Sequence, residues 1–168
     1  RGALKPMEMR RGLFLWSLLS VVVAALSLGP SFAHVLEAVP RLTIWPPELW
    51  RDATVFNAQF EYFAIVGAPL DVGAVIILAI LTFLARGERR AFHFVLAAAL
   101  LYAAALATWL LWVAPANAVL ATWEPGPIAS DFAAVRDRWE TGHMAVAAFK
   151  FIGFIALASG LLSVRAKN

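Results

Sequence analysis

Two ionisable residues interrupt stretches that are otherwise apolar enough to cross a membrane. Asp71 lies within YFAIVGAPLDVGAVIILAILTFLA, and Lys150 lies within GHMAVAAFKFIGFIALASGLL. A charge at that depth costs several kcal/mol unless it faces the protein interior and meets a partner, so it marks a candidate functional site. Asp71 follows Glu61 by ten residues and Lys150 follows His143 by seven, which puts both charges roughly 10–15 Å below the same membrane surface. We therefore predict a buried Asp71–Lys150 ion pair.

A second set of polar residues reaches that same surface from several apolar stretches. One stretch ends in His-x-x-Glu, another begins with a single Glu, and a third begins with Glu-x-x-His. Residues three apart share a helix face, and dimetal carboxylate bundles combine Glu-x-x-His pairs with single glutamates. The match is incomplete, because the first motif is reversed and the remaining stretch offers only an asparagine. The spacing predicts a metal site with five candidate ligands: His34, Glu37, Glu61, Glu140 and His143.

The same histidines allow a second interpretation. Two histidines at equal depth on different spans can be the axial ligands of haem b, so His34 and His143 are also candidate cofactor ligands, with Trp139 beside them. In either case, or as acid–base groups, the two histidines should approach one another across the bundle. A third interpretation is a hydrogen-bond network at the outer end of the bundle that only fixes helix packing. The sequence does not identify a cofactor. The candidate catalytic residues are Glu61, Asp71, Asn117 and Lys150.

Four long apolar runs must position these residues. Hydrophobic residues make up 62% of the chain and charged residues 15%, whereas about a quarter of a soluble domain is charged. The runs cover about 12–38, 62–85, 92–116 and 140–164, and each is long enough to span a bilayer. The sequence predicts an all-α membrane protein: one antiparallel four-helix transmembrane bundle over residues 1–168, in contact with the lipid bilayer.

The first external loop contains a further element. Pro46 and Pro47 precede a plausible amphipathic segment, and proline is favoured in the first turn of a helix. Trp45 and Trp50 flank this start, and tryptophan is enriched at the headgroup level. We expect a short interfacial helix that lies on the outer surface of the membrane.

Charge sets the expected orientation. Apart from Lys150, nine basic residues lie on the side of the termini and of the 86–90 loop, against four on the other side. We expect the membrane to be a bacterial inner membrane. The positive-inside rule then places both termini in the cytoplasm. The same rule explains the net charge of +3 without a nucleic-acid partner. The absence of cysteine excludes disulfides, thiolate metal ligands, Fe–S clusters and dithiol chemistry.

Four segments carry a resemblance to a known family: FAHVLEAVPRL, VGAPLDVGA, WVAPANAVLATW and DFAAVRDRWETGHMA. Together they resemble the anthrone-oxygenase-like family of bacterial four-helix membrane proteins, which is largely a domain of unknown function. The similarity runs from about residue 28 to residue 160. Its polar signature matches Asn117 in a P-x-N motif and Trp139 and His143 in a W-x-x-x-H motif. The chain lacks the arginine expected three residues after His143, which leaves Lys150 as the only basic residue deep in that helix.

Two functions follow from these observations. The resemblance implies oxygenation of anthrones or other aromatic polyketide intermediates. With the polar pocket, it points to an oxidoreductase that acts on a lipophilic aromatic or quinone-like compound. The alternative is a non-catalytic accessory subunit of a larger bacterial membrane complex, or a homo-oligomer, because the chain is small and has few residues outside the apolar runs.

Overall fold

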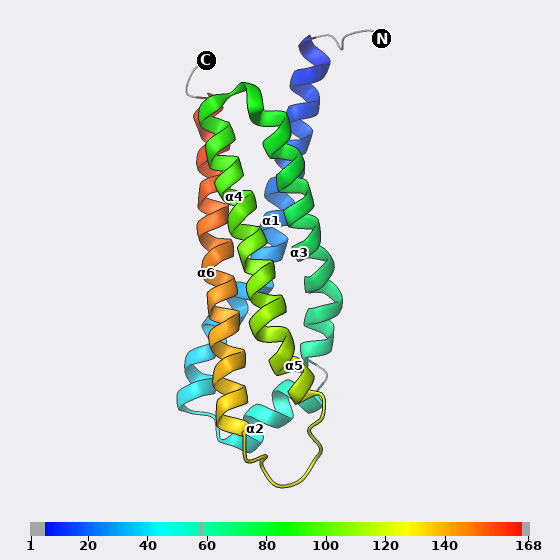
Figure 1. Ribbon diagram of the computed structural model, residues 1–168, viewed down its shortest axis with the longest axis vertical. Coiled ribbons are helices and arrows are strands. Elements are labelled where there is room, and N and C mark those ends of the chain that lie inside the picture. Colours follow the sequence, from blue (N-terminus) through cyan, green and yellow to red (C-terminus); the bar gives the residue numbers. More distant parts are fainter. Residues whose placement is uncertain (1–5, 58, 166–168) are drawn as a thin grey trace.

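The computed structural model describes residues 6–57 and 59–165, and none of these residues lies in a β-strand. Four long helices make up the bundle: α1 (Pro6–Thr43), α3 (Gln59–Leu84), α4 (Arg89–Thr108) and α6 (Phe132–Arg165) (Figure 1). All four are long and apolar enough to cross a membrane. The predicted all-α four-helix membrane bundle is confirmed.

Short elements connect the long helices. α2 (Pro47–Arg51) and the π-helix η1 (Asp52–Phe56) join α1 to α3, and a single 3-10 turn, η2 (Ala85–Gly87), joins α3 to α4. The third span does not end with α4, because it continues through the π-helix η3 (Trp109–Val113) and then α5 (Ala114–Leu120). The fourth helix begins at Phe132, because FAAVRDR folds as its first two turns ahead of the apolar run that starts near residue 140.

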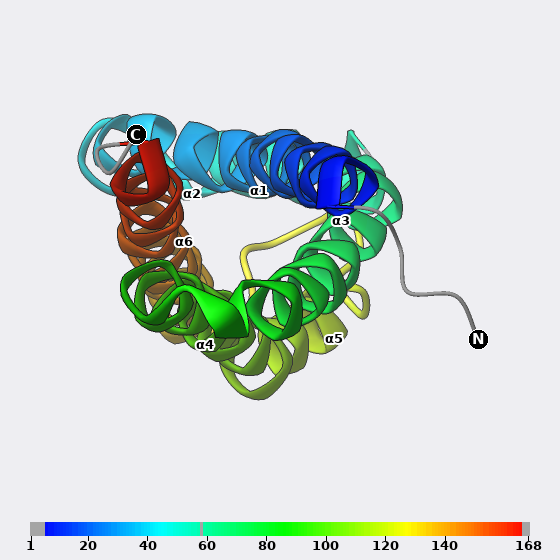
Figure 2. The same cartoon turned by 90° about the horizontal axis from the view of Figure 1, so that it is seen from above.

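Seen along its axis, the bundle is a ring in which each long helix packs on two neighbours (Figure 2). α1 packs on α3 and α6, and α4 packs on the same two helices from the opposite side. We name the two ends of the bundle by the elements that lie there in Figure 1. The terminal end is where α1 begins and α6 ends, beside η2, and the loop end holds α2, α5 and the 121–131 loop.

The core near the terminal end is tightly packed. Leu78, Leu81 and Leu157 are fully buried there with Tyr102, whose hydroxyl donates a 2.8 Å hydrogen bond to the carbonyl of Ala24. α6 approaches α4 through its glycines: a Cβ added at Gly153 would lie 2.9 Å from the Tyr102 ring. The small residue is therefore required by the contact between these two helices.

At the loop end a second core is built of aromatic rings. Trp50 packs edge-to-face on Trp139 and Phe132, with ring centroids 5.6 and 5.7 Å apart, and Trp123 packs on Phe132 at 5.7 Å. We call these four residues the aromatic cap. The short helix predicted after Pro46 is present, but the headgroup position predicted for Trp50 is wrong, because its side chain is fully buried. Its indole N–H is satisfied inside by the carboxylate of Glu140, at 2.8 Å.

The close approach of α6 to α4 gives a first prediction. Gly153→Leu should lower the stability of the folded bundle by about 1–3 kcal/mol, because the new side chain overpacks against Tyr102. Gly29→Leu is the matched control, since an added Cβ there meets nothing within 4 Å. Thermal unfolding of both variants in the same detergent measures the difference. Equal melting temperatures would show that α4 and α6 are not in close contact at this position.

Candidate functional site

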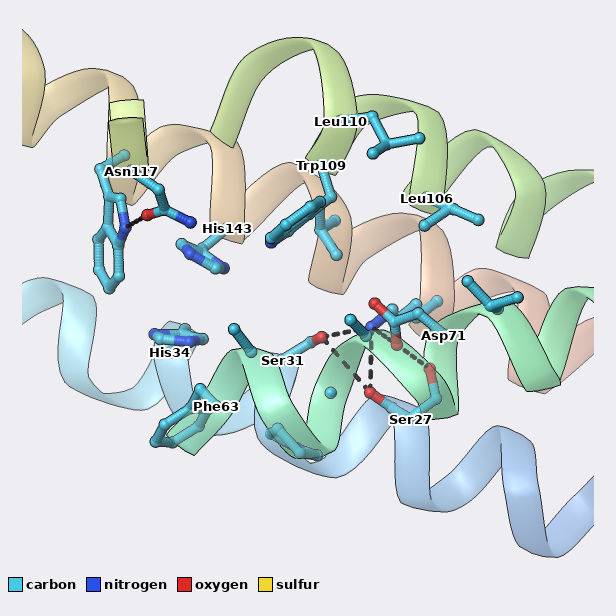
Figure 3. A pocket seen from close by; sticks show the side chains of 18 residues that line it. Ser27, Ser31, His34, Phe63, Asp71, Leu106, Trp109, Leu110, Asn117 and His143 are labelled. Atoms are coloured by element: carbon cyan, nitrogen blue, oxygen red, sulfur yellow. Dashed lines mark hydrogen bonds and ion pairs between the residues drawn. The ribbon is translucent and has the colours of Figure 1, made fainter. Parts of the chain in front are cut away.

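A cavity of about 190 Å³ lies between α1, α3, α6 and the α4–η3 junction. The two histidines predicted as ligands stand at one end of it and Asp71 stands at the other (Figure 3). Apolar and aromatic side chains form most of the wall between these ends, including Phe63, Leu106, Trp109 and Leu110. The cavity therefore offers an apolar chamber with polar groups at both ends, as small-molecule sites do.

The predicted ion pair is confirmed. Lys150 Nζ lies 2.6 Å from Asp71 Oδ1, and it also donates to Ser31 Oγ at 2.8 Å and to the carbonyl of Ser27 at 3.1 Å. An ammonium group has three protons to donate, so every one of them has an acceptor. Ser27 Oγ in turn donates to Asp71 Oδ1 at 2.7 Å. This network joins α1, α3 and α6 near the middle of each helix.

The two serines were missed by the sequence interpretation. Serine hydroxyls in apolar helices usually bond to the carbonyl four residues earlier, as Ser20 does with the carbonyl of Trp16. Ser27 and Ser31 lie four apart, on one face and at the depth of the predicted charges. That spacing, combined with the need of Lys150 for hydrogen-bond acceptors, is the signal in the sequence from which the two serines could have been predicted as partners of the ion pair.

The two histidines meet as predicted. The rings of His34 and His143 stack with centroids 4.0 Å apart and planes inclined by 26°. Trp139 contacts both rings edge-on, and Phe63 covers the other side of His34 with centroids 5.0 Å apart. His34 Nδ1 is buried and has no hydrogen-bond partner among the described residues. A buried polar atom of this kind is where a bound water or ligand is expected to bond.

This stacking does not match the geometry of a haem held between His34 and His143. Axial ligands bind the iron from opposite faces of the porphyrin, so the whole macrocycle must lie between the two imidazole rings. Rings that stack at 4.0 Å are in direct contact and leave no space for it. The described arrangement thus does not support haem b between the two rings, whereas an acid–base role needs no space between them.

The five predicted metal ligands do not converge either. Among the residues that the structure describes, no three His, Cys, Asp or Glu side chains gather closely enough to hold a metal ion. Glu61 is exposed and does not line the cavity. Glu37 is turned to Arg41, with 2.5 Å between carboxylate and guanidinium. Only the two histidines of that set reach the cavity, so the described structure does not assemble the predicted five-ligand site.

Glu140 belongs to a separate buried network at the loop end. Its Oε1 accepts the hydrogen bond from Trp50 and lies 3.9 Å from Arg41 Nη1. Arg41 is itself buried, and its guanidinium stacks on Trp139 at 5.7 Å and on Trp45 at 5.5 Å. Trp139 contacts both this network and the two histidines. The sequence interpretation missed Arg41, because it counted this residue only as an exposed basic charge of the outer side.

Three of the four predicted catalytic residues line the cavity, and Glu61 is the exception. Asn117 acts through its neighbour, since its Oδ1 accepts a 2.7 Å hydrogen bond from Trp139 Nε1. That bond fixes the indole against both histidines. Asn117 and Trp139 are thus positioning residues for the histidine pair.

The π-helix η3 shapes the wall opposite the ion pair. π-helical segments inside α-helices are rare and occur frequently at functional sites, and here the segment carries Trp109 and Leu110 into the lining. Pro115, just after this segment, has no backbone N–H to donate to the preceding turn. Arg138 on α6 donates there instead, since its guanidinium bonds the carbonyls of Trp112 at 3.0 Å and Leu111 at 3.3 Å.

The ion pair gives the second prediction. Lys150→Met alone leaves the Asp71 carboxylate buried without its counter-charge, which in buried pairs typically costs about 3–5 kcal/mol. Asp71→Leu combined with Lys150→Met should be more stable than Lys150→Met alone, because no uncompensated charge remains. Denaturant unfolding in detergent micelles measures both variants against the unchanged protein. If all three proteins unfold at the same denaturant concentration, the pair contributes nothing to folding.

No family model, curated protein or solved structure matches this chain. Its chemistry must therefore be argued from the cavity itself.

Proposed function

We propose that this protein is a membrane-embedded oxidoreductase that uses dioxygen to oxidise a lipophilic aromatic or quinone-like compound inside the cavity. The observation that carries the proposal is the stacked His34–His143 pair, which faces an apolar chamber. One of its ring nitrogens, His34 Nδ1, has no hydrogen-bond partner among the residues that the structure describes. An imidazole held in this way can remove a proton from a bound substrate. The resemblance to the anthrone-oxygenase-like family, carried by its motifs alone, points to the same reaction class.

The reaction needs no electrons from the protein. A methylene group next to an aromatic ketone loses a proton to an imidazole and becomes a delocalised enolate, which is electron-rich enough to reduce dioxygen. The balance is R₂CH₂ + O₂ → R₂C=O + H₂O, in which the methylene carbon is oxidised by four electrons. One oxygen atom stays on the carbon as the new carbonyl, and the other leaves as water with both methylene hydrogens.

Each end of the cavity has a distinct part in this scheme. The histidine pair acts as the base, and Asn117 and Trp139 hold it in place. At the other end the Lys150 ammonium stays fixed by Asp71, Ser27 and Ser31. A positive charge that is already oriented, in a region of low dielectric, stabilises negative charge as it develops on the enolate oxygen.

The third prediction tests the base. The protein in lipid nanodiscs should accelerate the conversion of anthrone to anthraquinone in air, followed by absorbance and oxygen consumption. His143→Gln and His34→Gln should each slow turnover by about 10²–10⁴-fold, the usual contribution of a general base. His93→Gln is the matched control, because His93 is an exposed histidine near the terminal end, outside the cavity, whose Nδ1 is hydrogen-bonded to the carbonyl of Arg89.

Two outcomes would contradict the proposal. One is an unchanged rate in both cavity variants while their circular dichroism matches that of the unchanged protein. The other is a rate for the unchanged protein that equals the rate of empty nanodiscs, with anthrone and with a series of smaller aromatic ketones.

The accessory-subunit alternative is favoured by one observation. Every proton of Lys150 is already bonded within the chain, as expected of a charge whose task is to hold three helices together. In that case the protein serves a larger membrane complex, or a second copy of itself, without chemistry of its own. A double variant of Asp71 and Lys150 that folds, and still assembles with the same co-purifying chains, would support this alternative.

We also propose a location: a bacterial inner membrane with the terminal end in the cytoplasm. One observation supports the orientation: the start of α1, the end of α6 and the η2 turn lie at the same end of the bundle (Figure 1). The excess of basic residues at that end favours the cytoplasmic side.

The fourth prediction concerns this orientation. A green fluorescent protein fused after Asn168 should fluoresce, and alkaline phosphatase fused at the same point should be inactive, because only the cytoplasm supports the first and only the periplasm the second. Fusions after Glu124, in the loop-end segment, are the control and should give the opposite pattern. Active phosphatase at Asn168 would reverse the proposed orientation.

A further inference from the structure

The cavity is closed toward the loop end of the bundle. The aromatic cap lies across that end, and within it the side chains of Trp50 and Trp139 are buried, as is Leu120 beside them. The buried Arg51 links the two loops at this end, because its Nη1 donates a 2.6 Å hydrogen bond to the carbonyl of Gly126 in the 121–131 loop. A ligand that arrived along the bundle axis would have to displace this packed core.

The side of the cavity between α3 and η3 is different. Val72 on α3 and Leu110 on η3 both line the cavity, yet they are 45% and 53% exposed on the outer surface of the bundle. Ala68, one helical turn before Val72, also lines the cavity and is exposed. Residues that border a cavity and face outward at the same time mark the edge of an opening.

The depth of this opening places it in the hydrocarbon region. Val72 lies near the middle of α3, beside Asp71, whose side chain is 12% exposed. The residues at the edge of the opening are apolar, so they are suited to contact with lipid tails rather than with water. The polar groups of the site lie deeper in the bundle, behind these residues. The surface outside the opening is therefore the interior of the bilayer.

We propose that the cavity takes its ligand sideways from the bilayer, through an opening between α3 and η3 that is edged by Ala68, Val72 and Leu110. The inference rests on the proposed function for the nature of the ligand, a small planar aromatic molecule with a polar atom. The access path itself is independent of what happens to that molecule afterwards. A lipophilic ligand is concentrated in the bilayer by the same burial of apolar area that drives folding, so a lateral opening meets the ligand where it is most abundant.

The volume of the cavity agrees with this geometry. About 190 Å³ is somewhat more than the roughly 150 Å³ of an engineered apolar cavity that holds benzene. It is less than the roughly 300–1,000 Å³ of pockets that enclose a drug-sized ligand. One or two rings therefore fit inside, and the remainder of a larger ligand extends through the opening among the lipid tails.

Photolabelling in nanodiscs tests the access path without relying on turnover. The probe is 3-trifluoromethyl-3-phenyldiazirine, an apolar aromatic molecule that dissolves in the bilayer, and mass spectrometry locates its adducts. We expect adducts on the cavity residues Phe63 and Trp109 in the unchanged protein. Val72→Trp should lose these adducts, because the larger ring covers the opening from α3. Ile76→Trp is the matched control, since Ile76 is an exposed residue one turn further along α3 that does not line the cavity.

A second variant pair covers the opposite edge. Leu110→Trp should also lose the adducts in the cavity, whereas Leu111→Trp, at a neighbouring lipid-facing position that is 75% exposed, should keep them. A carboxylated diazirine that stays in water should not label the cavity in any variant. Circular dichroism and gel filtration confirm that the four variants remain folded.

Three results would overturn the inference. They are adducts in the cavity that persist in both Val72→Trp and Leu110→Trp, labelling of the cavity by the aqueous probe, and absence of apolar label from Phe63 and Trp109 in the unchanged protein. The test also separates this inference from the proposed reaction. Normal lateral labelling in a protein that does not oxidise anthrone would reject the reaction and keep the access path.

Discussion

The ion pair between Asp71 and Lys150 is the constraint on which the rest of the structure depends. A membrane interior has no water to solvate a stray charge, so each member of the pair must find its partners within the protein. Those partners come from three helices: the carboxylate from α3, the ammonium from α6, and two serines from α1. The relative depth of these helices is thereby fixed at one point. The histidines lie about two turns nearer the loop end, and they are brought to the same depth because the ion pair fixes how α1 and α6 are aligned.

Much of this arrangement can be predicted from the residues. Long apolar runs give the spans, and the costs of buried charge predict that Asp71 and Lys150 must pair. Equal depth predicts that His34 and His143 meet. These inferences succeed because each follows from the bilayer, which limits where a polar group can lie and removes most alternatives before any packing detail matters.

Other features follow from packing and were not predictable from spacing. Glu37, Glu61 and Glu140 share a depth with the histidines, yet depth does not determine the direction in which a side chain points around its helix. Glu37 is turned to Arg41 and Glu140 to Trp50, so both carboxylates point away from the histidine pair. Trp50 shows the same limit, since an amphipathic loop segment can lie on a membrane or fold back over the bundle. The buried hydrogen-bond acceptor decides between the two positions.

The four helices divide the work of the cavity unequally. In the part of the chain that the structure describes, α4 and η3 contribute no charged group and no hydrogen bond to the ion pair, and they reach the cavity with apolar and aromatic side chains alone. The wall formed by α1, α3 and α6 therefore carries the charges and hydrogen bonds that hold the bundle together. The facing wall, formed by α4 and η3, takes no part in these interactions. Evolution, or a protein engineer, can replace Leu106, Trp109 or Leu110 to alter which molecules fit while leaving the stabilising network untouched. The scaffold thus separates the residues that must be kept from those that can be varied.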